Sequence, residues 1–134
     1  MPDFLTKRER SALMSRIRGK NTGIERSVFR RLRIEGVAFS RHAKSLPGRP
    51  DVVIRSAKLA VFLDGDFWHG RRFEQWRYRL SPFWRKKIEG NISRDRSCRG
   101  RLRRMGWRVL RLWGKDILRS EDRCIARIRK ILAR

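Results

Sequence analysis

The sequence predicts a single α/β domain in which a mixed β-sheet is flanked by helices. Short runs rich in β-branched and aromatic residues lie between longer segments whose apolar residues recur at helical spacing. A chain of 134 residues can bury one substantial core but is too short for two typical domains. No repeat or low-complexity linker divides it. We therefore expect one domain over residues 1–134, with two helices, three strands, a helix, a strand and a helix in that order.

Capping signals predict the two N-terminal helices. Thr6 and Glu9 have the spacing of a capping box that opens a short helix. The narrow apolar face of this helix consists of Leu13, Met14 and Ile17. Thr22 and Glu25 repeat the signal and open a longer helix that ends near Gly36. Its apolar positions are Ile24, Val28, Phe29 and Leu32.

Three strands are predicted to follow. The segment "GVAFSRH" (36–42) predicts the first, and "SLPGRP" (45–50) is a loop by its proline and glycine content. The runs "DVVIR" (51–55) and "KLAVFLD" (58–64) are separated by a short turn at 56–57, so they should pair as adjacent antiparallel strands. The last run is almost continuously apolar, which indicates burial on both faces of the sheet.

The remaining elements are a long helix, a strand and a terminal helix. Ser81 as the N-cap and Pro82 at the first helical position start a helix that is predicted to reach Met105. The run "WRVLRLW" (107–113) predicts a strand, and the tail (119–134) predicts a helix packed against the core. The core-facing residues of that tail, which is helical from Ser120, are Ile125, Ile128 and Leu132.

The charge of the chain indicates a nucleic-acid partner. Lysine and arginine total 37 against 13 acidic residues, a formal charge of +24 that is spread over the whole length. Such a body attracts polyanions through phosphate neutralisation and counterion release. A charge excess that serves only solubility is the alternative, and charge alone does not distinguish DNA from RNA. A membrane surface is disfavoured because the apolar face that it requires is committed to the core.

Cysteine usage and hydropathy set the expected location. Cys98 and Cys124 lack metal-ligand spacing and are expected to be reduced core residues. No apolar run approaches the roughly 18 residues of a membrane span, and "MPDFLTKRER" lacks the apolar centre of a signal peptide. We expect a cytoplasmic protein that associates with the nucleoid.

Two acids at strand ends predict a metal site. Asp51 opens one predicted strand and Asp64 closes its antiparallel neighbour, so both carboxylates should lie at one edge of the sheet. There they could share a hard cation such as Mg²⁺ through oxygen ligands. Acids at strand ends are also common as solvated turn formers, and Asp64 alone would carry little weight.

A histidine and a helical acid complete a candidate catalytic set. His69 follows in the same loop, and its near-neutral pKa suits proton transfer. Asp95 falls on the apolar stripe of the long helix, where a buried carboxylate needs a partner. An arginine would be the ordinary partner, whereas His69 would gain a fixed tautomer. The stripe itself consists of Trp84, Ile88, Ile92, Cys98, Leu102 and Met105.

Several further residues have both a functional and a plain structural interpretation. Lys87 and Asn91 lie along the edge of the helical stripe and could contact phosphate or be solvated. Glu25 could cap its helix or assist the site. The large aromatic residues of the loop and of the long helix could cover the sheet edge or insert between DNA bases at a distortion. They are Phe67, Trp68 and Trp84.

The chain resembles the very short patch repair (Vsr) endonucleases, a branch of the PD-(D/E)XK superfamily with a restriction-endonuclease-like fold. Five blocks in suitable order over roughly residues 10–118 carry the resemblance. They are "MSRIRGKNTGIE", "SLPGRPDVVI", "AVFLDGDFWHG", "FWRKKIEGNISRD" and "LRRMGWRVLRLW". Members of the family nick one strand of DNA beside a T:G mismatch left by deamination of 5-methylcytosine.

The resemblance implies a role for each matching residue. Asp51 would be the central Mg²⁺ ligand, assisted by the backbone carbonyl of Leu63. His69 would be the general base or acid, Asp95 its carboxylate partner and Glu25 an auxiliary acid. Residues 1–20 would contact DNA. The implied intercalating residues are Met14, Phe67, Trp68 and Trp84.

The chain departs from the family at two places. Well-studied members have Thr-His where this chain has Leu63-Asp64, so Asp64 is predicted to add a direct metal ligand. The family's structural zinc is predicted to be absent, because its expected ligand positions hold other residues. These are Asp66, Arg71 and Phe73, with Gly114-Lys115 after Trp113.

We therefore expect a monomeric, Mg²⁺-dependent endonuclease that nicks double-stranded DNA at a T:G mismatch. The first alternative is a site-specific nuclease of the same fold, associated with homing or restriction, that acts on matched duplex. The second is a DNA-binding module without catalysis, against which the complete set of Asp51, His69 and Asp95 argues.

Overall fold

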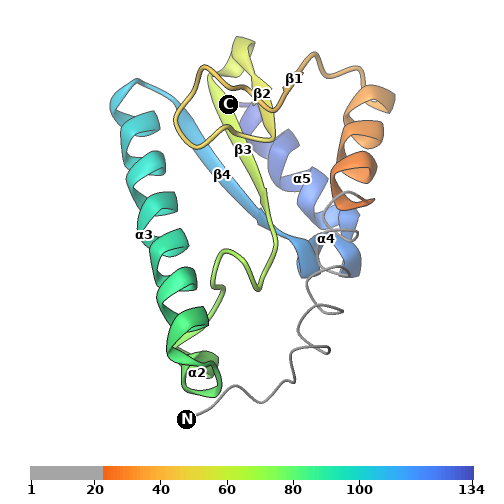
Figure 1. Ribbon diagram of the computed structural model, residues 1–134. Helices are drawn as coiled ribbons and strands as arrows, with labels where there is room; N and C mark the ends of the chain where they lie inside the picture. Colours follow the sequence, from red (N-terminus) through yellow and green to blue (C-terminus); the bar gives the residue numbers. More distant parts are fainter. Residues whose placement is uncertain (1–22) are drawn as a thin grey trace.

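The computed structural model describes residues 23–134 (Figure 1). Several expectations fall on residues 1–22 and so lie outside the described residues. They are the short first helix, the DNA-contacting segment 1–20, the capping residue Thr22, and the position of Met14. From residue 23 onward, a helix of residues 23–34 precedes a turn at Gly36, whose φ of +72° favours glycine. The predicted end of this helix is confirmed.

A four-stranded mixed sheet forms the centre of the domain, with the order β1-β2-β3-β4. Its strands are β1 (Ser40–Arg41), β2 (Val52–Ile54), β3 (Leu59–Asp64) and β4 (Arg108–Trp113). The predicted antiparallel pairing of the second and third strands is confirmed, with Val52 opposite Val61. Strand β4 runs parallel to β3 and places Trp113 opposite Asp64. The expected α/β fold with a mixed sheet is therefore confirmed.

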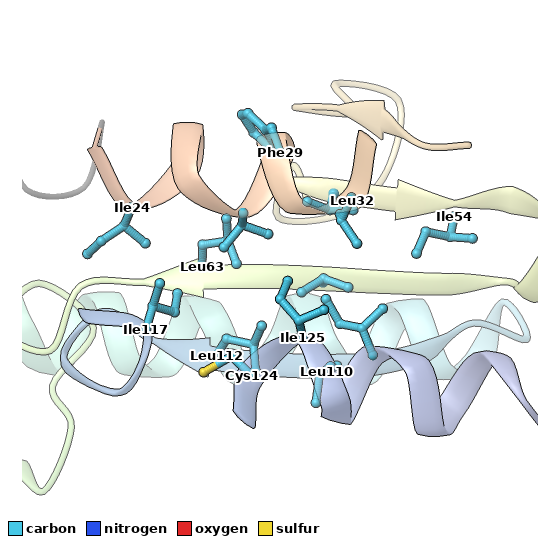
Figure 2. Packing of buried hydrophobic residues seen from close by; sticks show 14 of the residues in the cluster. Ile24, Phe29, Leu32, Ile54, Leu63, Leu110, Leu112, Ile117, Cys124 and Ile125 are labelled. Atoms are coloured by element: carbon cyan, nitrogen blue, oxygen red, sulfur yellow. The ribbon is translucent and has the colours of Figure 1, made fainter. Parts of the chain in front are cut away.

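Two layers of helices enclose this sheet (Figure 1). Helix α3 (Pro82–Arg104) covers one face, and the helix of residues 23–34 covers the other together with α5 (Glu121–Leu132). Side chains alternate between the two cores, so Val61 and Leu63 face α5, whereas Ala60 faces α3. Burial of β3 on both faces, as its apolar run predicted, is confirmed. Figure 2 shows the larger core, in which Leu112 and Ile125 lie between sheet and helix.

Some elements differ from the prediction. The first strand keeps only Ser40–Arg41 of the predicted 36–42, because its partner β2 is itself only three residues long. The turn at 56–57 is a 3-10 helix, η1 (Arg55–Ala57), closed by Lys58 with a φ of +49°. Three short helices were not predicted, because each has fewer than two turns of periodic sequence. They are α2 (Phe73–Trp76), η2 (Arg77–Arg79) and α4 (Gly114–Arg119).

The long and terminal helices follow the prediction closely. Helix α3 starts at Pro82 and ends one residue before Met105, which is 49% exposed and does not belong to the buried stripe. In α5, Ile125 and Ile128 are buried as expected. Cys124 is a free thiol in the same core, whereas the free Cys98 is only half-buried. Among the described residues, no helix is both long and apolar enough to cross a membrane.

Candidate active site

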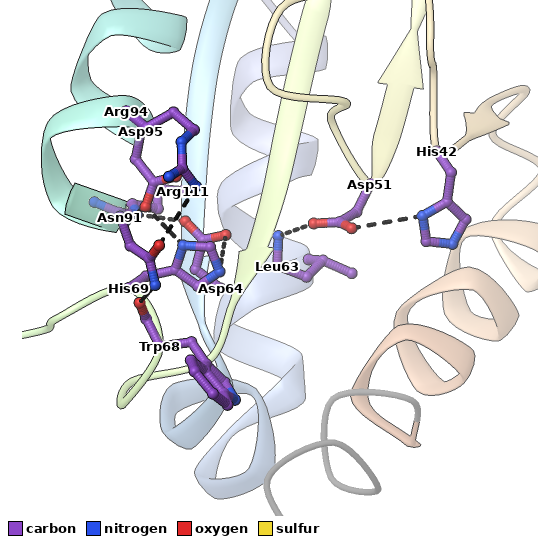
Figure 3. A network of polar contacts seen from close by, with 10 residues as sticks. All are labelled: His42, Asp51, Leu63, Asp64, Trp68, His69, Asn91, Arg94, Asp95 and Arg111. Atoms are coloured by element: carbon purple, nitrogen blue, oxygen red, sulfur yellow. Dashed lines mark hydrogen bonds and ion pairs between the residues drawn. The ribbon is translucent and has the colours of Figure 1, made fainter. Parts of the chain in front are cut away.

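Two polar clusters lie on either side of the end of strand β3 (Figure 3). The first combines Glu25 from the helix of residues 23–34, His42 after β1, and Asp51 before β2. One ligand atom from each residue lies within 4.8 Å of the others. The His42 Nε2 atom is 3.4 Å from a Glu25 oxygen, and its Nδ1 atom is 3.7 Å from Asp51 Oδ1. The cluster therefore offers two carboxylates and one imidazole to a cation.

The carboxyl group of Asp51 is held in an electrostatically unfavourable position. Burial raises its pKa to about 7, against the opposing effect of the Leu63 backbone N–H, which donates to Oδ2 at 2.7 Å. The negative charges of Glu25 and Asp64 raise this pKa further. A divalent cation would relieve the repulsion between these carboxylates, so the donor set fits the predicted Mg²⁺.

Leu63 takes part through its backbone. In an extended strand, the N–H and C=O groups of one residue point to the same side. Because the Leu63 N–H donates to Asp51, we expect the Leu63 carbonyl to face the same edge of β3. This orientation is compatible with the carbonyl ligand that the family resemblance implies.

The second cluster is built around His69 and lies on the α3 side of the sheet (Figure 3). The His69 Nδ1 atom is 2.6 Å from Asp95 Oδ2, and its Nε2 atom is 3.6 Å from Asp64 Oδ1. Arg111 on β4 donates to Asp64 at 2.5 Å and to Asp95 at 3.2 Å. Burial lowers the pKa of His69, but the hydrogen bond to Asp95 and the charge of Asp64 outweigh it, so this pKa is raised overall.

Asp95 has both of the partners that its sequence position suggested. It contacts His69 and, through the same Oδ2 atom, the guanidinium of Arg111. A carboxylate at Nδ1 favours the tautomer with hydrogen on that atom and leaves Nε2 to exchange protons. The contact between loop and helix therefore provides the geometry that proton transfer by His69 would need.

Asp64 and Asp51 belong to different clusters, although both lie at the expected end of the sheet. Figure 3 shows their carboxylates on opposite sides of β3. The side chain of Asp64 is 7% exposed and is paired with Arg111, whereas Asp51 faces Glu25 and His42. The shared cation and the direct role of Asp64 in metal binding remain predictions. In the structure, Asp64 orients Arg111 and faces His69.

The three aromatic residues form a packed cluster over the N-terminal part of α3. The ring of Phe67 lies 5.5 Å from that of Trp68 and 6.2 Å from that of Trp84, and it stacks on Trp76 at 5.6 Å. All four rings are half-buried against Phe73, Leu80 and Ile88. Packing thus accounts for part of their surface and leaves the rest accessible to a partner.

Asn91 and Lys87 both contact the loop that follows β3. The Asn91 side-chain amide donates to the backbone carbonyl of Trp68 at 2.9 Å. The Lys87 ammonium lies 5.9 Å from the centre of the Trp68 ring, within cation–π range. Neither residue is simply a solvated edge position. Their contact with DNA remains a prediction.

Sequence reasoning did not identify His42 or Arg111 as part of the site. The backbone N–H of His42 donates to the carbonyl of Asp51, which places the two residues side by side. Strand pairing could have revealed this neighbour once the register between residues 40–41 and 52–53 was known. Arg111 had a clearer signal, because it alternates with the apolar Leu110 and Leu112 and therefore faces α3.

Comparisons with known proteins show that the chain is similar to DNA endonucleases. Residues 2–75, more than half of the chain, match the family described as DNA mismatch endonuclease Vsr. The DNA mismatch endonuclease Vsr of Escherichia coli (strain K12) is 37% identical over 115 residues, covering 84% of this chain and 74% of that protein. Type II nicking enzyme V.XorIIP of Xanthomonas oryzae pv. oryzae is 39% identical over 134 residues, with 98% of each chain covered. Type II nicking enzyme V.NmeDIP of Neisseria meningitidis serogroup C is 35% identical over 131 residues, covering 96% of this chain and 88% of that enzyme.

Proposed function

The chain belongs to the Vsr family of DNA endonucleases, and we propose that it nicks one strand of double-stranded DNA at a T:G mismatch by Mg²⁺-dependent hydrolysis. Its mixed sheet flanked by helices is the PD-(D/E)XK nuclease fold of that family. The observation that carries the proposal is the contact of His69 with Asp95 beside a second cluster suited to a cation.

Asp51 and the Leu63 carbonyl would hold the metal, with Glu25 as an auxiliary acid. His42 adds an imidazole to this donor set. When bound, Mg²⁺ would neutralise phosphate charge and lower the pKa of an attacking water. Direct coordination by Asp64 would use its Oδ1 atom, because Oδ2 accepts a hydrogen bond from Arg111 at 2.5 Å.

His69 would transfer the proton from its Nε2 atom. Asp95 orients the ring through Nδ1, and the raised pKa of His69 favours the protonated form of the ring. A protonated ring suits the acid role. As the water oxygen bonds to phosphorus, the water releases a proton to the solvent, and as the bond to the leaving oxygen breaks, Nε2 donates its proton to that oxygen. Arg111 lies beside Asp64 and Asp95, where its single positive charge offsets part of the charge of the two carboxylates.

The arginine-rich body would bind the phosphate backbone, and the aromatic cluster would test the base stack. Phe67, Trp68 and Trp84 come from two separate elements and meet ring to ring. Inserting such rings between base steps costs a few kcal/mol and costs least where pairing is already distorted. This dependence supports a preference for mismatched DNA.

A second candidate is a nuclease that nicks matched duplex at a particular sequence. It is favoured by the names of V.XorIIP and V.NmeDIP, which state a type II nicking enzyme and mention no mismatch. The altered pair Leu63-Asp64 and the loop after it also leave room for a changed specificity.

One experiment separates these functions. A labelled duplex with one central T:G pair is compared with its T:A twin, in Mg²⁺ or EDTA, using wild type and Asp51→Ala. Nicking of the mismatch alone, dependent on Mg²⁺ and on Asp51, is the expected result. Equal nicking of both duplexes would favour the second candidate. Salt-sensitive binding without any nicking, on these duplexes and on a random-sequence duplex library, would indicate a non-catalytic DNA-binding module.

A further inference from the structure

Arg71 forms an ion-pair clamp that joins the loop of residues 65–72 to helix α4. Its guanidinium meets the Asp116 carboxylate through two parallel hydrogen bonds, Nη1 to Oδ1 at 3.1 Å and Nη2 to Oδ2 at 2.9 Å. The Nη1 atom also donates to Asp66 Oδ2 at 3.2 Å. We call Asp66, Arg71 and Asp116 the Arg71 clamp. Two-bond pairing of this kind fixes the orientation of both groups as well as their separation.

Further contacts join the clamp to the start of helix α4 and to the end of strand β4. The second oxygen of Asp66 accepts the backbone N–H of Lys115 at 3.0 Å, so Asp66 bridges the loop and the start of α4. The centre of the Trp113 ring is 5.4 Å from the guanidinium of Arg71 and 4.2 Å from that of Arg111. Trp113 thereby connects the clamp to the arginine that holds Asp64 and Asp95.

The residues at the zinc-ligand positions of the family do not fit a structural zinc ion. Zinc in structural sites takes cysteine thiolates and histidine nitrogens. Here a guanidinium stands at Arg71, a buried phenyl ring at Phe73 and an ammonium at Lys115. Of these positions only Asp66 offers a ligand atom, and its two oxygens are already engaged by Arg71 and Lys115.

The loop that the clamp holds carries the candidate catalytic residue His69 and the aromatic residues Phe67 and Trp68. On its other side, Asn91 holds the carbonyl of Trp68. Gly70 packs so closely on α3 that an added Cβ would lie 2.4 Å from the Ile92 side chain, and its φ is +67°. The loop is therefore attached to α3 at Trp68, His69 and Gly70, and to α4 through the clamp.

We propose that Arg71 is a positioning residue that holds His69 and the aromatic cluster in their working orientation by a metal-free clamp to Asp116. The proposal rests on the function assigned above to His69. Losing the clamp would free one side of the loop while leaving the core layers unchanged. Small displacements of a reacting group can reduce rates by about 100-fold.

Three variants test the clamp. Arg71→Gln removes the guanidinium of the clamp. Asp116→Asn removes the carboxylate charge that attracts Arg71, and it makes the protein more cationic. Arg72→Gln is the matched control, because Arg72 is adjacent, exposed and outside the clamp. Hydrogen–deuterium exchange of the peptide covering 65–73 is measured without DNA. We expect faster exchange in the first two variants and wild-type exchange in the control.

The kinetic arm uses single-turnover nicking with a duplex that the wild type cleaves. Arg71→Gln and Asp116→Asn should lower the rate at saturating DNA by about 10- to 100-fold, with little change in half-saturation. Arg72→Gln should instead weaken binding and leave the saturating rate unchanged. Equal kinetic effects of the two arginine variants would overturn the positioning role.

The hydrogen–deuterium exchange measurement tests the clamp independently of the proposed nuclease activity. Exchange needs no substrate, so it decides the clamp even if T:G nicking fails. Unchanged exchange in both clamp variants would overturn the proposal whatever the activity. Adding 1,10-phenanthroline to the wild type should leave the melting temperature unchanged, and a fall would overturn the metal-free assignment.

Discussion

Replacing Asp95 with asparagine should impair His69 and change the pH dependence of nicking. The substitution removes the charge that sits 2.6 Å from His69 Nδ1 and keeps the size of the side chain. An amide can also present its NH₂ group to Nδ1, which would favour the wrong tautomer. Positioned acid–base groups contribute roughly 100- to 10,000-fold to rates, so we expect a loss of that order at neutral pH, or about 3 to 5 kcal/mol of barrier.

The direction of the pH shift follows from the causes of the raised pKa. Asp95 raises the pKa of His69 and burial lowers it, so Asp95→Asn leaves the burial effect and this pKa falls. If His69 acts as an acid, the rate falls as pH rises through its pKa. The falling limb of the profile should then move to lower pH in the variant.

Single-turnover rates between pH 5 and 9 measure this effect. Glu89→Gln is the matched control, because Glu89 lies on the same helix and pairs with Arg77 on the surface, away from the site. An Asp95→Asn profile that coincides with that of Glu89→Gln would refute the reasoning. A rising limb in place of the falling one would assign His69 the base role.

Other consequences of the structure can be measured separately. The pKa of the Asp51 carboxyl group is raised from 3.8 to about 7, so its contribution to stability is present at low pH and is lost as pH rises between these values. Asp51→Asn should therefore raise the unfolding free energy of the metal-free protein at pH 8 by about 2 to 4 kcal/mol, measured by urea unfolding. Mg²⁺ should raise the melting temperature of wild type but not of this variant. Asp64→Asn should change the Mg²⁺ dependence of nicking if Asp64 is a direct ligand, and an unchanged dependence would exclude that role. Trp68→Ala should reduce the ratio of T:G to T:A nicking rates, and a ratio equal to wild type would remove Trp68 from mismatch sensing. Leu112→Ala should cost about 2 to 5 kcal/mol in urea unfolding because Leu112 is fully buried, and a cost below 1 kcal/mol would contradict its place in the core.

Local patterns were sufficient to predict the sheet and the helix that carry the site. The almost continuously apolar run 58–64 predicted β3, because a strand that is buried on both faces needs apolar residues at nearly every position. The helical spacing that placed Asp95 on the stripe of α3 also brought it toward the sheet, where the structure has it in contact with His69. Both inferences depend on periodicity within a single element.

Relations between elements were harder to predict. The ends of β2 and β3 were expected together, but the side to which each carboxylate points depends on the twist and pairing of the strands. For this reason Asp51 faces His42, whereas Asp64 faces Arg111. Helix α4 was not predicted, because "GKDILR" is a single short segment whose conformation is set by its packing between β4 and α5.

The position of Leu63 and Asp64 as consecutive residues of β3 constrains how this protein can change. The backbone of the first serves the Asp51 cluster, and the side chain of the second serves the His69 cluster. Side chains alternate along a strand, so an insertion or deletion of one residue here would turn Asp64 into the α5 core and bring an apolar side chain to His69. Sequence variation within β3 should therefore proceed by substitution at fixed length, and length changes should be confined to the loops that follow it.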